Sequence, residues 1–179
     1  MTSIYNPKSL VETLKLQFPK RNIFSLPRLN KVVINYRVSD SRESQEALNA
    51  AEVEIMSITG QKPRLCRSKK SIANFKLREN EPLAYKVTLR GLRMYHFVEK
   101  LFNIVFPRLR DFKGLPVTNF DDAGNYNLTI KDQTYFPEIN LDKINKIRSV
   151  QVTLNISASS KEESKMLLSA LGFPFEKTN

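Results

Sequence analysis

The segment 31–38 (KVVINYRV) carries apolar side chains at every second position, at Val32, Ile34, Tyr36 and Val38. Successive side chains of a strand point to opposite faces, so this segment is predicted to form a strand with one face to bury. Asn35 and Arg37 would then point to the other face. A strand of this kind requires a covering layer on one side only.

Three further segments, 86–90, 126–131 and 149–157, alternate in the same way. Amphipathic helices are predicted over 43–59 and 92–106, after Pro7, and after the Ser160–Glu163 capping box. Helices with a single apolar stripe cover one face of a sheet. We therefore expect an α+β fold, a largely antiparallel sheet with helices packed on one face, with residues 1–26 as an N-terminal helix or arm and 27–179 as a single domain.

The outward positions of these four strands hold no carboxylate. They are Asn35, Arg37, Lys86, Thr88, Arg90, Asn127, Thr129, Lys131, Gln151, Thr153 and Asn155. Amides, hydroxyls and cations suit contacts with phosphate, sugar and base edges, where hydrogen-bond donors are needed and negative charge is unfavourable. The alternative is a solvent-exposed polar face with no partner.

Basic charge is concentrated in one part of the chain. Residues 62–113 hold fourteen Lys or Arg and four Asp or Glu, whereas the whole chain has a net charge of +11. Residues 62–78 hold seven basic side chains and no acidic one. Such a concentration indicates a polyanionic partner. Residues 67–82 are too polar for a core strand, and we expect a long basic loop or hairpin tip that protrudes from the sheet.

Several other classes of function lack a sequence signature. Cys66 is the only cysteine, so no internal disulfide and no cysteine-based zinc site is possible. No apolar run is long enough to span a membrane, and no phosphate-binding glycine motif occurs. His96 is predicted to be a surface residue, and the adjacent Asp121 and Asp122 to form a turn. We therefore expect no enzyme, cofactor, metal or membrane partner.

RNA is favoured over DNA because the chain has no helix-turn-helix, zinc-finger spacing or basic heptad region for the major groove. The aromatic pattern of the common RNA-recognition motif is also missing, which points to irregular folded RNA. A free-standing, non-specific RNA chaperone is the alternative.

A series of short motifs resembles one known family. They are TGQKP at 59–63, KKSIA at 69–73, FKLRE at 75–79, KVTLRG at 86–91, RMY at 93–95, PR at 107–108, RDF at 110–112, GL at 114–115, GNY at 124–126, FPEI at 136–139, DK at 142–143, KIR at 146–148 and LGFPF at 171–175. Their order and spacing resemble the bacterial-type ribosomal protein five family of the large subunit, over about residues 27–175.

The resemblance implies a structural protein of the central protuberance that binds 5S rRNA and helps fix it to the large-subunit rRNA. It places 5S rRNA contacts at Asn35, Gln61, Lys62, Thr88 and Arg90. Three of these, Asn35, Thr88 and Arg90, are also outward positions of the predicted sheet. Neighbouring large-subunit proteins are further implied partners.

The resemblance also implies that loop 67–82 reaches toward the P-site tRNA, with a bridge to a small-subunit protein on the same side. The implied loop contacts are Lys69, Lys70, Asn74, Phe75, Lys76 and Arg78. The family usually carries glycine at the positions of Tyr36–Arg37, Asn74 and Asn80. Since Asn tolerates a positive φ, we expect the turns at Asn74 and Asn80 to be kept.

The low glycine content, the absence of Trp and the many Asn residues suggest an AT-biased genome. This composition favours a mitochondrial or plastid ribosome over a bacterial one.

Overall fold

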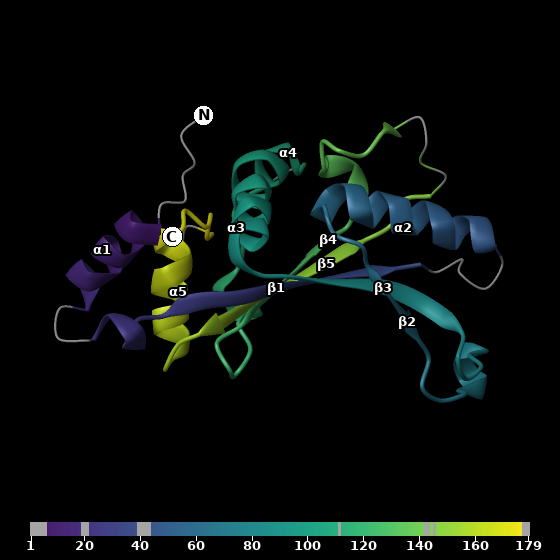
Figure 1. Ribbon diagram of the computed structural model, residues 1–179, viewed down its shortest axis with the longest axis horizontal. Helices are drawn as coiled ribbons and strands as arrows, with labels where there is room; N and C mark the ends of the chain where they lie inside the picture. The colour runs from purple at the N-terminus through teal and green to yellow at the C-terminus, as the bar shows by residue number, and fades with distance from the viewer. Residues whose placement is uncertain are drawn as a thin grey trace. The chain divides into compact units, whose positions relative to one another are not determined.

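The expected α+β fold is confirmed by a computed structural model, which describes residues 7–18, 22–38, 44–110, 112–141, 144 and 146–176. Five strands form a largely antiparallel sheet in the order β2-β3-β1-β5-β4. They are β1 (Arg28–Arg37), β2 (Arg64–Arg67), β3 (Pro82–Leu89), β4 (Tyr126–Ile130) and β5 (Val150–Ser157) (Figure 1). The four strands predicted from alternation are all present, and β2 is the fifth.

The helices are α1 (Pro7–Gln17), α2 (Gln45–Thr59), α3 (Gly91–Lys100), α4 (Phe106–Arg108) and α5 (Lys161–Ala170). The predicted helix 92–106 differs in one respect. A π-helical stretch, Leu101–Val105, connects α3 to α4, and Pro107 lies inside the last turn instead of following it. Proline has no N–H with which to continue the helical hydrogen bonds, and the helix ends soon after it. Leu109 then adopts an extended conformation and ends the helix.

The described chain forms two compact units. The first contains the residues up to Val32, together with Arg90–Leu128 and the segment from Thr153 onward. The second contains Val33–Leu89 and Thr129–Val152. The predicted boundary at residue 26 stays a prediction.

In the second unit, α2 lies along one face of β1 and β3 (Figure 1). The four residues predicted for the apolar stripe of α2 are buried: Leu48, Ala51, Ile55 and Ile58. The inward side chains of the strands are buried as well, among them Ile34 and Val87. Ser44 caps the helix by accepting hydrogen bonds from the N–H groups of Glu46 and Ala47. The alternation therefore identified the correct buried face.

A buried polar network joins β1, α2 and the segment before β5. The Glu54 carboxylate accepts a hydrogen bond from the Tyr36 hydroxyl and lies 3.4 Å from an Arg148 guanidinium nitrogen. Burial, and then the Glu54 carboxylate, raise the pKa of Tyr36 well above its ordinary value. The Arg148 N–H donates to the side-chain oxygen of the fully buried Gln133 at 2.5 Å. This network fixes the chain that leads into β5.

In the first unit, α1 packs against α5, and aromatic rings fill the core. The Tyr126 and Phe173 rings lie 4.8 Å apart between centroids, and those of Phe102 and Phe173 lie 5.1 Å apart, both edge to face. The Tyr126 hydroxyl donates to the Pro116 carbonyl at 2.8 Å. Burial raises the pKa of Tyr126 to about 12.

The polar ends of this unit follow local rules. Ser160 caps α5 by accepting from the Glu163 N–H at 3.3 Å, as the capping box predicted. The Glu163 carboxylate accepts from the N–H of Ser159, one residue earlier than in the standard box. Asp121 accepts two hydrogen bonds from Asn125, which confirms the predicted turn and lowers the pKa of the Asp121 carboxyl.

Among the described helices, none is both long enough and apolar enough to cross a membrane.

Candidate nucleic-acid interface

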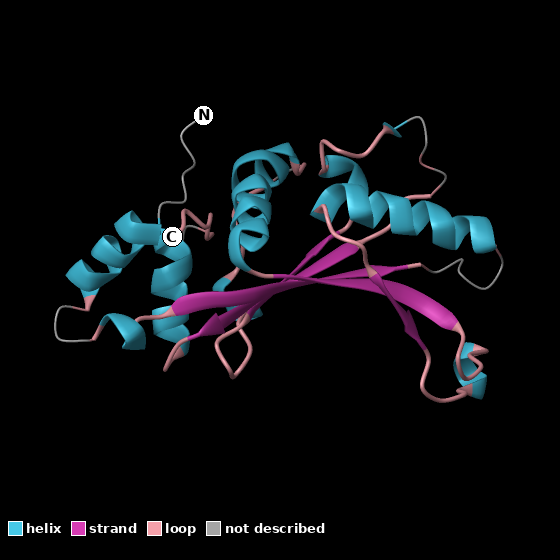
Figure 2. Cartoon of the chain, in the orientation of Figure 1, coloured by secondary structure: helices cyan, strands magenta, loops and turns pink. Residues whose placement is uncertain are grey.

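The outward residues of the second unit are polar and reach solvent. None is buried, and none carries a negative charge: Asn35, Arg37, Lys86, Thr88, Thr129, Lys131 and Gln151. Helix α2 covers the opposite face of these strands (Figure 2). The uncovered face therefore offers amide, hydroxyl and cationic donors to a ligand, as the sequence predicted.

Three outward residues of the first unit have internal partners instead. The Thr153 hydroxyl donates to the Asn127 side-chain oxygen at 2.7 Å. The Asn155 amide donates to the Asn125 side-chain oxygen, also at 2.7 Å. These cross-strand bonds use donors that alternation alone had assigned to the exposed face. We conclude that Asn127, Thr153 and Asn155 have a structural role in this unit.

The structure brings Gln61 and Thr88 together. Gln61 follows α2 and donates from its side-chain nitrogen to the Thr88 carbonyl at 3.3 Å. Both residues are half-exposed, and Lys62 beside them is exposed. Arg90, in the first unit, is exposed at the N-terminal cap of α3. The five residues implied for 5S rRNA binding are thus all accessible to solvent.

The predicted protruding loop is an ordered extension of the β2–β3 hairpin. Its base is fixed by the buried Ser68, whose hydroxyl donates to the Arg78 carbonyl and accepts from the Glu81 N–H at 3.1 Å. The Ser68 N–H donates to the Glu81 carbonyl at 2.9 Å. Figure 2 shows the loop turning toward the side of the sheet away from α2.

The tip of the loop is a short helical turn, Ala73–Phe75, closed by backbone pairing of Ile72 with Leu77. The residue after this turn, Lys76, has a φ of +49°, and Asn80 has a φ of +63°. The positive φ expected at Asn80 is confirmed. A turn is also kept at Asn74, but without a positive φ: the chain passes through Asn74 in a helical conformation and reverses at Lys76. Lys69, Lys70, Asn74, Phe75, Lys76 and Arg78 are all exposed.

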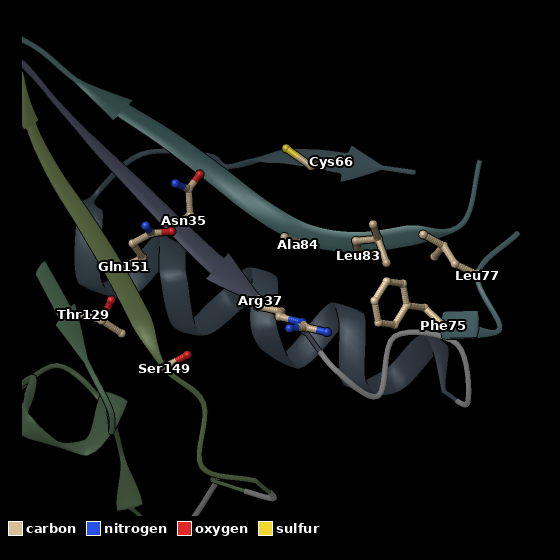
Figure 3. A pocket seen from close by; sticks show the side chains of 10 residues that line it. All are labelled: Asn35, Arg37, Cys66, Phe75, Leu77, Leu83, Ala84, Thr129, Ser149 and Gln151. Atoms are coloured by element: carbon tan, nitrogen blue, oxygen red, sulfur yellow. The ribbon is translucent and has the colours of Figure 1, made fainter. Parts of the chain in front are cut away.

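A hollow of about 910 Å³ lies on the exposed face of the second unit, beneath the loop (Figure 3). We call it the sheet hollow. Its lining is Asn35, Arg37, Cys66, Phe75, Leu77, Leu83, Ala84, Thr129, Ser149 and Gln151. Two of these, Phe75 and Leu77, come from the loop, whose residues we had expected to reach away from the sheet. Two apolar side chains in a strongly basic loop were the signal that could have indicated this.

The described residues contain no group of three His, Cys, Asp or Glu side chains close enough to hold a metal ion. The site is therefore defined by hydrogen-bond donors, cations and one exposed aromatic ring.

Two family models match the chain. Residues 22–78 match the family described as "Ribosomal protein L5", and residues 82–175 match the model of the C-terminus of the same ribosomal family. A protein of Thermoanaerobacter sp. (strain X514) is 50% identical over 170 residues, which cover 95% of each chain. One from Caldanaerobacter subterraneus is 49% identical over the same share. One from Clostridium botulinum (strain Loch Maree) is 49% identical over 94% of this chain and 93% of its own. All three are named "Large ribosomal subunit protein uL5".

Proposed function

Because the chain belongs to the ribosomal protein L5 family, whose members are structural constituents of the large ribosomal subunit, we propose that it binds 5S rRNA through the exposed face of its sheet. The contacts are Asn35, Gln61, Lys62, Thr88 and Arg90. Members of the family are structural proteins and not enzymes.

The observation that carries this proposal is the absence of a carboxylate among the described outward residues of the sheet in the second unit. Asn35 and Thr88 are half-exposed there, next to the exposed Arg37 and Lys86. An RNA with irregular backbone presents phosphates, 2′-hydroxyls and base edges at close range. Amides and hydroxyls on a rigid sheet hold their hydrogen-bonding groups in fixed positions, and this favours one RNA shape over others.

The basic loop is proposed to contact P-site tRNA through Lys69, Lys70, Asn74, Phe75, Lys76 and Arg78. The four cations of this set are exposed, and the base of the loop is fixed by Ser68. A charged, ordered extension is suited to a partner that arrives and leaves repeatedly, because charge steers association. The further partners that we propose are large-subunit rRNA, neighbouring large-subunit proteins and a small-subunit protein at an intersubunit bridge.

The expectation of an organellar ribosome receives no support from the relatives named above, which are bacterial. Family membership supports a location on the ribosome and does not distinguish a bacterial from an organellar one.

The test is a binding titration of the purified chain against 5S rRNA and against an unrelated structured RNA of equal length, at several salt concentrations. A strong preference for 5S rRNA that persists as salt rises is expected for specific contacts. Equal affinities that fall together would indicate counterion release alone and favour the non-specific RNA chaperone.

A further inference from the structure

We propose that the sheet hollow receives a single unpaired nucleobase of the bound RNA, stacked against the ring of Phe75. This inference rests on the proposed function, and it moves Phe75 from the tRNA-facing set to the 5S rRNA-facing set. All ten residues given above as the lining of the hollow belong to the second unit.

The lining of the hollow matches the two chemical parts of a nucleotide. Phe75, Leu77 and Leu83 supply apolar surface where the loop meets β3 (Figure 3). Asn35, Thr129 and Gln151 supply polar groups from β1, β4 and β5, which continue the same sheet beyond β3 (Figure 3). A base has an apolar face that stacks on aromatic rings and a polar edge that forms hydrogen bonds. A purely apolar side chain of a partner protein would form no hydrogen bonds with the polar residues of this lining, so a nucleobase fits the hollow better.

The size and charge of the hollow also favour a nucleotide. Its volume of about 910 Å³ falls within the range of pockets that enclose small ligands. A hollow of this size can hold one splayed nucleotide, but not a stretch of RNA helix. Among the described residues no carboxylate lines it, and the guanidinium of Arg37 extends toward Phe75 (Figure 3). A cation in this position would neutralise the phosphate of the inserted nucleotide.

The loop holds Phe75 in this position at a cost. Lys76, a residue with a β-carbon, adopts a φ of +49°, which is unfavourable for L-amino acids. This reversal lets the Lys76 N–H bond to the Ala73 carbonyl at 2.9 Å, and it allows Ile72 to pair with Leu77. The Phe75 ring nevertheless stays 71% exposed. The turn therefore presents an aromatic ring that a ligand can reach from solvent.

The first test uses the absence of tryptophan from the chain. Phe75→Trp places a single fluorescent indole in the hollow, and Phe24→Trp provides the control, because Phe24 is 87% exposed and belongs to the first unit. Saturating 5S rRNA should quench the emission of the Phe75→Trp protein strongly, as stacking on a base does, and leave that of the control nearly unchanged.

The outcomes separate the inference from the proposed function. If the Phe75→Trp protein binds 5S rRNA with normal affinity and its emission does not change, the inference is wrong and the proposed function stands. Quenching by tRNA but not by 5S rRNA would return Phe75 to the tRNA-facing set and also overturn the inference. Failure of the unsubstituted chain to bind 5S rRNA would overturn both.

A second test needs no tryptophan. Cys66 is the only cysteine and lines the hollow, so bound 5S rRNA should slow its alkylation by a maleimide at least several-fold. Phe75→Leu keeps an apolar side chain but removes the ring, and it should weaken 5S rRNA binding by about 5- to 150-fold, the usual effect of losing one stacked base. An unchanged alkylation rate, together with unchanged affinity of Phe75→Leu, would contradict the inference.

Discussion

The side-chain amide of Gln61 donates a hydrogen bond to the main-chain carbonyl of Thr88 at 3.3 Å, across 27 residues of sequence. The bond uses the backbone of Thr88 and not its hydroxyl. The Thr88 hydroxyl can therefore be removed without loss of the contact that holds Gln61 in place. This makes Thr88 a clean position at which to measure what a single sheet hydroxyl contributes to RNA binding.

Thr88→Val should weaken 5S rRNA binding by about 1–3 kcal/mol, since a buried RNA group would lose its hydrogen-bond partner. Valine keeps the β-branched shape that the strand favours, so the fold should be unaffected. Thr88→Ser should retain most of the affinity. A titration of these two proteins and of Thr118→Val, an exposed control outside the sheet, measures the effect. Equal affinity of all three would mean that Thr88 contacts no RNA.

Simultaneous replacement of Lys69, Lys70 and Lys76 by Ala should leave 5S rRNA affinity nearly unchanged and weaken tRNA engagement. The three cations are exposed on the loop, and none of them lines the sheet hollow or belongs to the set proposed to bind 5S rRNA. The matched control is the triple Ala variant of Lys15, Lys113 and Lys165, which removes the same charge from positions of the first unit that reach solvent. A large loss of 5S rRNA affinity specific to this variant would contradict the proposal that these three cations serve tRNA and not 5S rRNA.

The sequence predicted the strands and their buried faces because alternation is a local signal. Val32, Ile34, Tyr36 and Val38 are at most 1% exposed, as the pattern of 31–38 requires. The helix caps at Ser160 and the end of α2 at Gly60 were equally predictable from short motifs. The order and spacing of the short motifs indicated the family, and the two family models confirm that family.

Contacts between distant segments were not predictable in this way. No local pattern relates Glu54 to Arg148, which are 94 residues apart, or Thr153 to Asn127. The sheet hollow depends on the direction in which the loop turns, and that direction is set by the reversal at Lys76. A lysine gives no sequence signal for a positive φ. The sequence therefore indicated a positive φ at Asn74 and Asn80, where the family usually has glycine, and not at Lys76.

Arg148→Met should lower the free energy of unfolding by about 3–5 kcal/mol, because it leaves the Glu54 carboxylate buried without its cation. The side chains of Arg148 and Glu54 are only 3% and 11% exposed. Chemical denaturation of Arg148→Met, Glu54→Gln and the double variant measures the coupling. The double variant should regain much of the loss, since no buried charge remains. A double variant as unstable as the sum of the single ones would argue against this pairing.

The stability of the chain should fall between about pH 10 and pH 12. An unfolded tyrosine ionises near pH 10, whereas the buried Tyr126 keeps its proton to a pKa of about 12. The folded state therefore binds more protons in this range, and the stability that is fully present below pH 10 is lost as pH rises. Tyr36 acts in the same direction, since burial also raises its pKa.

Tyr126→Phe should reduce the alkaline loss of stability by about 2 kcal/mol, at the cost of the Pro116 hydrogen bond at neutral pH. Denaturant unfolding from pH 8 to 12 checks this, and an unchanged slope would contradict it.

Gly124→Ala should destabilise the chain by more than Gly172→Ala, although both glycines have a similar φ, +77° and +83°. A β-carbon at Gly124 would lie 2.7 Å from the Ser164 hydroxyl oxygen, whereas one at Gly172 meets nothing within 4 Å. Gly172→Ala therefore reports the backbone strain alone, about 1–2 kcal/mol. The excess cost of Gly124→Ala measures the steric clash in the turn that Asp121 and Asn125 close.

The double variant Gly124→Ala/Ser164→Ala should recover this excess, because the next contact of the new β-carbon, with the β-carbon of Ser164, is at an ordinary 3.7 Å. Thermal or denaturant unfolding of the four proteins gives the comparison. Equal losses for Gly124→Ala and Gly172→Ala would mean that α5 moves to accommodate the methyl group. In that event the Lys161–Asp122 ion pair, which links α5 to the same turn at 2.9 Å, should change as well. The Asp122→Asn variant would then affect stability differently in the Gly124→Ala background than in the unsubstituted chain.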